Sequence, residues 1–134
     1  METICKGKAF AGEIRTIRWQ SWGTLNIRIF SMLIVNSCNN IPIRLTDERW
    51  QHIVTRHPEM NDLKKQVLET VTEPDMIQKG DFGELLAIRF YHKTPLTSKF
   101  LVVAYREVSQ NDGFIITAYL TNEPSNKRII LWKR

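Results

Sequence analysis

The chain has 134 residues, which suits one domain, and 43% of them are hydrophobic, which is enough for a real core and excludes an intrinsically disordered class. The formal net charge of +5 favours a polyanionic partner, most often nucleic acid, although a charge of this size is weak evidence by itself. No apolar run reaches the roughly 18 residues that a membrane-spanning helix needs, so we expect no membrane, no export and a cytoplasmic location.

The first forty residues have the least regular pattern in the chain. Residues 25–35 alternate in a way that fits a strand, but the stretch before them shows neither a helical nor a strand period. We therefore divide the chain into an N-terminal extension over residues 1–40, either poorly ordered or partly strand, and a single α+β domain over residues 41–134.

Two observations leave the role of this extension open. Met32 would serve as a natural start of the protein, whereas Trp19 and Trp22 are side chains that usually need burial. Cys5 and Cys38 have no clustered His or Cys neighbours, so we expect no structural zinc site. A disulfide between them is an open alternative that the sequence does not indicate, and a reducing cytoplasm is the default.

Residues 44–59, RLTDERWQHIVTRHPE, hold the densest cluster of chemically useful side chains. Thr46 is a good N-cap, and Pro58 ends the helix because the residue before a proline avoids the α region. The pattern predicts a helix from residue 47 to residue 56 or 57. At about 100° per residue it has an apolar face and an opposite basic face, formed by Trp50, Ile53, Val54 and His57 and by Arg49, His52 and Arg56.

The rest of the chain is organised as a second helix followed by strands. An apolar stripe predicts a helix over residues 63–72, which Pro74 ends. The later stretches rich in β-branched and aromatic residues predict strands, over residues 75–78, 84–92, 99–108, 113–121 and 127–133. Their short connections favour an antiparallel meander. We therefore expect two N-terminal helices packed on one face of a four- to five-stranded antiparallel sheet.

Alternation along these strands separates an apolar face from a mixed face. The apolar set should contact the helices: Leu86, Ile88, Phe90, Phe100, Val102, Ala104, Phe114, Ile116, Ala118 and Leu120. The mixed set should be exposed: Arg89, Tyr91, Lys93, Tyr105, Glu107, Thr117, Tyr119 and Thr121. Tyrosines can stack on bases and cations can hold phosphate, so this face suits RNA. An ordinary solvated sheet face is the alternative.

Several motifs together resemble a known group of nucleases. They are LTDERWQHIVTRHPEM, EPDMI, YHK, GFIITAY and a terminal LW, and the resemblance covers about residues 43–134. The group consists of small phage-, toxin- and cyanobacteria-associated proteins placed with the barnase–EndoU–colicin–RelE-like nucleases. The resemblance implies helices followed by an antiparallel sheet, and a metal-independent endoribonuclease without a cofactor. It also implies RNA as the substrate and an antitoxin protein as a partner.

The same resemblance implies candidate catalytic residues. His57 matches the histidine at the helix end, and His52 matches an earlier one. Thr117 and Tyr119 match the TAY strand motif, and Arg56 could bind phosphate. For each a structural alternative exists: His57 could cap its helix, and Arg56 could pair with an acid.

The candidate substrate-binding residues come from the mixed sheet face and the basic helix face. They are Arg89, Tyr91, Lys93, Tyr105 and Arg49. We expect no metal site, since His52 and His57 lie five residues apart on different helix faces. A non-catalytic RNA-binding or regulatory module, or a protein-interaction domain that contacts an antitoxin, is the alternative function.

Overall fold

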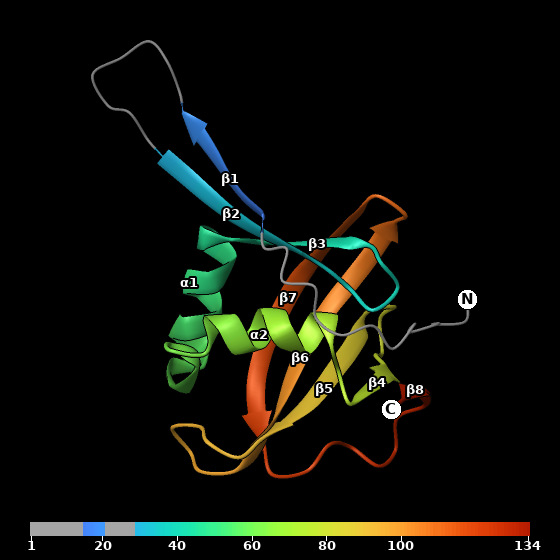
Figure 1. Cartoon of the computed structure of the whole chain (residues 1–134). Helices are drawn as coiled ribbons and strands as arrows, with labels where there is room; N and C mark the ends of the chain where they lie inside the picture. Colours follow the sequence, from blue (N-terminus) through green and yellow to red (C-terminus); the bar gives the residue numbers. More distant parts are fainter. Residues whose placement is uncertain (1–14, 21–28) are drawn as a thin grey trace.

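The computed structural model describes residues 15–20 and 29–134. In order along the chain, the elements of these residues are β1 (Arg15–Gln20), β2 (Ile29–Asn36), β3 (Pro42–Thr46), α1 (Asp47–Arg56), the short 3-10 helix η1 (Pro58–Met60), α2 (Lys64–Thr72), β4 (Met76–Lys79), β5 (Leu85–Tyr91), β6 (Lys99–Ser109), β7 (Asp112–Thr121) and β8 (Ile130–Lys133). The strands form one sheet in the order β1-β2-β3-β7-β6-β5-β4-β8, with both helices against it (Figure 1).

The prediction of two N-terminal helices on a four- to five-stranded antiparallel sheet is wrong. Three strands precede α1 within the described residues, and the sheet is mixed because β3 pairs in parallel with β7 through Arg44 and Phe114. The sequence hides β3, since its alternation covers only five residues and leads directly into α1 at Thr46. The two helices themselves start and end within one residue of the predicted positions.

Strand β2 connects the predicted extension to the rest of the sheet. It pairs with β3, and Val35 is buried in the same core as the helices. The turn between them is held by Glu107 of β6, whose carboxylate accepts hydrogen bonds from Ser37 Oγ at 2.7 Å and Asn39 Nδ2 at 2.9 Å. The predictions for residues 1–14 and 21–28, which include the pairing of Cys5, lie outside the described residues.

The main core lies between the helices and one face of the sheet. The apolar stripe of α2 is buried as predicted, and Trp50 and Ile53 of α1 join it. The sheet contributes alternate residues, which include Ala87, Leu101, Val103, Tyr105, Ile115 and Ala118. None of the helices in the described part of the chain is long and apolar enough to cross a membrane.

The predicted faces of β5 and β6 are wrong. Leu86, Ile88, Val102 and Ala104 form a second buried cluster on the face away from the helices. Both strands contain continuous apolar runs, LLAI and LVVA, so alternation cannot tell their two faces apart. In β7 a register shift opposite Ala104 and Tyr105 turns Ile115 toward the helices. The exposed face with three tyrosines is therefore not formed.

Candidate functional site

Helix α1 and strand β7 run side by side along the edge of the sheet that β3 leaves uncovered. At one end Arg49 Nη1 donates a hydrogen bond to the backbone oxygen of Ile116, at 3.4 Å. At the other end the ring of His57 lies 6.0 Å from the ring of Tyr119, measured between centroids. The helix rises about 12 Å between its two contacts, and the strand about 10 Å. The two segments therefore run beside each other over a similar length.

The backbone at His57 is fixed on both sides. Its N–H donates to the oxygen of Ile53 at 2.8 Å, closing the last turn of α1, and its oxygen accepts from the N–H of Met60 at 2.9 Å. Pro58 begins η1 directly afterwards, where a proline loses no hydrogen bond. Because the chain is held before and after it, the backbone at His57 has a defined position.

The imidazole of His57 lies between an acid and a phenol. Nδ1 is 3.7 Å from Oε1 of Glu59, and Tyr119 lies on β7 beside the ring. The His57 side chain is 34% exposed, so solvent or a substrate can reach it. Among the described residues no hydrogen bond occupies its other nitrogen, Nε2. An imidazole with a carboxylate 3.7 Å from one nitrogen and its other nitrogen open can transfer a proton.

Thr117 lies on the same strand and on the same side as Tyr119, because they are two residues apart in β7. Both side chains are half-buried, and Tyr119 also packs against the second apolar cluster. The RHPE segment and the TAY strand thus meet through His57 and Tyr119. The structure gives no direct contact between His57 and Thr117.

The other predicted residues of α1 lie on the exposed side of the helix. His52 and Arg56 are exposed, and neither makes an ion pair or hydrogen bond with the described residues. Arg49 is also exposed, but its reach to β7 places it at the border of the two helix faces rather than opposite the sheet. A strip of exposed basic side chains therefore follows α1 beside the His57–Tyr119 contact.

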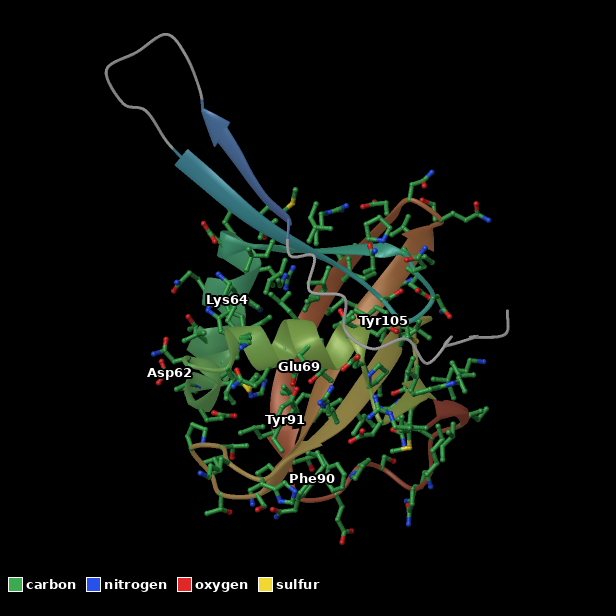
Figure 2. The ribbon with its side chains drawn as sticks, viewed as in Figure 1. Asp62, Lys64, Glu69, Phe90, Tyr91 and Tyr105 are labelled. Carbon is green, nitrogen blue, oxygen red and sulfur yellow. The ribbon has the colours of Figure 1, made fainter. Side chains whose placement is uncertain are left out.

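Arg89 and Tyr91, predicted to bind substrate, contact the α2 segment rather than the His57–Tyr119 pair. Arg89 Nη1 donates to the backbone oxygen of Glu73 at 3.0 Å, and Nη2 is 3.7 Å from Oε1 of Glu69. The Tyr91 hydroxyl donates to the same Glu69 carboxylate at 2.8 Å, beneath α2 (Figure 2). Burial raises the pKa of the Tyr91 phenol well above its usual value. These side chains fasten α2 to β5.

Tyr105 cannot contact a substrate, because it is fully buried in the main core. Its hydroxyl has no hydrogen-bond partner among the residues that the structure describes, and burial, together with the smaller effect of the Glu107 charge, raises the pKa of this phenol. Lys93 is exposed in the turn after β5, and strands β7 and β6 separate β5 from β3 in the sheet. Neither side chain makes an ion pair or ring contact with His57 among the described residues.

A pocket of about 220 Å³ opens where β3 leads into α1. It is lined by Arg44, Thr46, Arg49, Phe114 and Ile115. Arg44 forms an ion pair with Asp112, and its guanidinium lies 5.6 Å above the ring of Phe114.

Sequence reasoning missed Glu59, Arg44 and Phe114 as site residues. Glu59 belongs to the RHPE motif, and its position two residues after the histidine was a usable signal. Arg44 and Phe114 meet only through the parallel pairing of β3 with β7, for which no local signal exists.

No group of three or more His, Cys, Asp and Glu side chains that could hold a metal ion occurs in the described ranges. Comparison of the chain with models of protein families, with curated proteins and with solved structures finds no match.

Proposed function

We propose that this protein is a metal-independent endoribonuclease of a toxin-like kind, which cleaves RNA by attack of a ribose 2′-OH on the adjacent phosphate. The observation that carries the proposal is the contact between His57 and Tyr119. It joins the two motifs, RHPE and TAY, on which the resemblance to the nucleases rests, although they lie in separate parts of the sequence. An antitoxin protein is the partner that a toxin of this kind would require.

The reaction needs two proton transfers around one phosphorus atom. A bond forms between the 2′-oxygen and phosphorus, and the bond from phosphorus to the 5′-oxygen breaks. The 2′-OH loses a proton and the 5′-oxygen gains one, which leaves a cyclic phosphate and a free 5′-OH. Imidazole titrates near neutrality and suits such a transfer. We assign one of the two transfers to His57 and the other to solvent.

The neighbours of His57 have positioning roles in this proposal. Glu59 faces Nδ1 and orients the ring, so that Nε2 faces the substrate. The hydroxyl of Tyr119 donates a hydrogen bond to a phosphate oxygen, and Thr117 lines the same side of β7. Arg89 has no part in this site, because Glu69 and Glu73 hold it under α2.

The exposed basic strip of α1 supplies the charge that RNA needs. Arg49, His52 and Arg56 follow one side of the helix, and Arg56 lies in its last turn, next to His57. Guanidinium groups match phosphate oxygens through two parallel hydrogen bonds. In this arrangement Arg56 stabilises charge on the reacting phosphate, and Arg49 contacts the RNA strand further along.

The test is cleavage of several labelled RNAs by the purified protein in EDTA. We expect cleavage by the wild type and its loss in His57→Ala. His92→Ala is the matched control, since His92 is an exposed histidine that packs on Phe90 in the turn after β5. If the wild type cleaves no RNA, or if His57→Ala cleaves as well as the wild type, the catalytic proposal is wrong. Salt-dependent binding without cleavage would instead identify a non-catalytic RNA-binding module.

A further inference from the structure

We propose that the pocket between β3 and α1 is a subsite for a second phosphate of the RNA strand, several nucleotides away from the bond that is cleaved. This inference rests on the proposed function, because it takes RNA as the substrate and places the RNA strand along α1. The pocket volume of about 220 Å³ corresponds to about seven water molecules at roughly 30 Å³ each. It therefore has room for a phosphate with part of a nucleotide.

The chemistry of the pocket is that of two guanidinium groups beside an aromatic ring. Arg44 and Arg49 line it from β3 and α1, and the ring of Phe114 forms an apolar wall. Two arginines from different elements can hold the oxygens of one phosphate, and an aromatic wall can pack against a ribose or a base.

The backbone of the helix N-terminus does not supply this binding. Thr46 Oγ1 already accepts the N–H of Arg49 at 3.1 Å, and the first turn carries the acids Asp47 and Glu48. Any affinity for an anion must therefore come from the arginine side chains.

The position of the pocket relates it to the His57–Tyr119 contact. Arg49 and His57 are separated along α1 by a rise of about 12 Å. A stacked strand advances about 3.4 Å per nucleotide, so three to four nucleotides cover this distance. RNA that lies beside the basic strip would place one phosphate at His57 and another at Arg49.

Asp112 gives the subsite a built-in competitor. Its carboxylate forms an ion pair with Arg44, and both side chains are about two-fifths exposed, at 43% and 39%. A phosphate that enters the pocket must share Arg44 with this acid. Removing the acid should therefore strengthen RNA binding, whereas removing either arginine should weaken it.

The experiment measures binding of a labelled, mixed-sequence 2′-O-methyl RNA of about 12 nucleotides, a length within the usual site size of single-strand binding proteins. This probe has no 2′-OH and cannot be cleaved by the proposed reaction. We expect Arg44→Gln and Arg49→Gln each to weaken binding about threefold to tenfold, and each to lower the salt slope by about 0.7 for a lost phosphate contact. Asp112→Asn should strengthen binding about threefold.

The pair Arg128 and Asp81 provides matched controls. It is also an exposed ion pair, with Nη1 to Oδ1 at 3.0 Å, but it joins the β4–β5 turn to the segment before β8, at the opposite edge of the sheet. Arg128→Gln and Asp81→Asn change the net charge by the same amounts as Arg44→Gln and Asp112→Asn. Equal effects of the two sets would mean a response to net charge alone, and would overturn the subsite.

The outcomes separate this inference from the proposed function. If Arg44→Gln and Asp112→Asn change binding in opposite directions while the protein cleaves no RNA, the subsite is supported and the catalytic proposal fails. If the protein cleaves RNA but these variants bind the probe as the wild type does, the subsite is wrong and the catalytic proposal stands. A melting curve for each variant shows that it is folded.

Discussion

The imidazole of His57 lies 6.0 Å from the phenol ring of Tyr119, with the two ring planes tilted by 37°. This contact brings the end of α1 to the last part of β7, and the His57 side chain that makes it is still one-third exposed. A histidine sealed in the core would have only a packing role. The arrangement instead leaves Nε2 of His57 without a hydrogen bond to the described residues and places the ring next to that of Tyr119, and the proposed reaction rests on these two features.

We predict that His57 and Tyr119 act as one unit in cleavage. His57→Ala should lower kcat by about 10²- to 10⁴-fold, the usual contribution of a proton-transfer group. Tyr119→Phe, which removes only the hydroxyl, should lower it about tenfold. The double variant should be no slower than His57→Ala alone, since residues that act together are not additive. Single-turnover cleavage of a labelled RNA measures all three.

Thr121→Val is the control for this series, because Thr121 ends the same strand and its hydroxyl donates to the backbone of Glu123 rather than to the site. It should cleave at the wild-type rate. Effects of His57→Ala and Tyr119→Phe that simply multiply would show that the two side chains work independently, and the proposed unit would have to be abandoned.

The buried hydroxyl of Tyr105 predicts a stabilising substitution. It is fully buried and has no hydrogen-bond partner within the described part of the chain, so removing this group from water costs the folded protein free energy. Tyr105→Phe keeps the ring in the core and deletes the hydroxyl. We expect the free energy of unfolding to rise by about 1 kcal/mol, measured by urea denaturation. A decrease would mean that the hydroxyl makes a stabilising interaction after all.

The two buried phenols also predict how stability depends on alkaline pH. Burial raises the pKa of Tyr91 and of Tyr105 above the value in the unfolded chain, which is near 10. A raised pKa favours the protonated folded state, so its contribution is fully present below about pH 10 and is lost as the pH rises toward the folded pKa.

Each of these tyrosines can therefore reduce stability by up to about 1.4 kcal/mol per pH unit above about pH 10. Urea denaturation from about pH 8 to about pH 11 would measure this slope. Tyr105→Phe should make it shallower, and an unchanged slope in that variant would contradict the assignment to Tyr105.

The helices could be predicted from local chemistry, but the sheet could not. Thr46 as N-cap and Pro58 and Pro74 as stops are signals that act within a few residues, and both helices begin and end close to the predicted positions. The parallel pairing of β3 with β7 depends on residues far apart in the chain. The continuous apolar runs of β5 and β6 leave their faces undetermined until the helices are placed.

In the site, too, the local helical pattern gave a correct position, whereas the pairing of strands could not be predicted. The helical phase placed His57 on the inner face, and this residue indeed meets Tyr119. The period of two placed Tyr105 and Tyr119 on one face, but Tyr119 pairs with Val102, and alternation along β6 puts Tyr105 on the opposite face. Tyr105 thus turns into the core, while Tyr119 lies at the edge beside α1.

The position of Arg89 predicts a loss of stability without a specific loss of RNA binding. Its guanidinium contacts Glu69 and Glu73 of the α2 segment, and its ring neighbour Tyr91 shares the Glu69 carboxylate. Arg89→Gln leaves two partly buried acids without their cation, so we expect unfolding to become easier by roughly 1–2 kcal/mol. Urea denaturation measures this, and Lys93→Gln, an exposed cation on the following turn, is the control with the same charge change. For the uncleavable RNA probe, both variants should lose the same small amount of affinity. A much larger loss of affinity in Arg89→Gln than in Lys93→Gln would mean that Arg89 contacts the RNA, and would contradict this prediction.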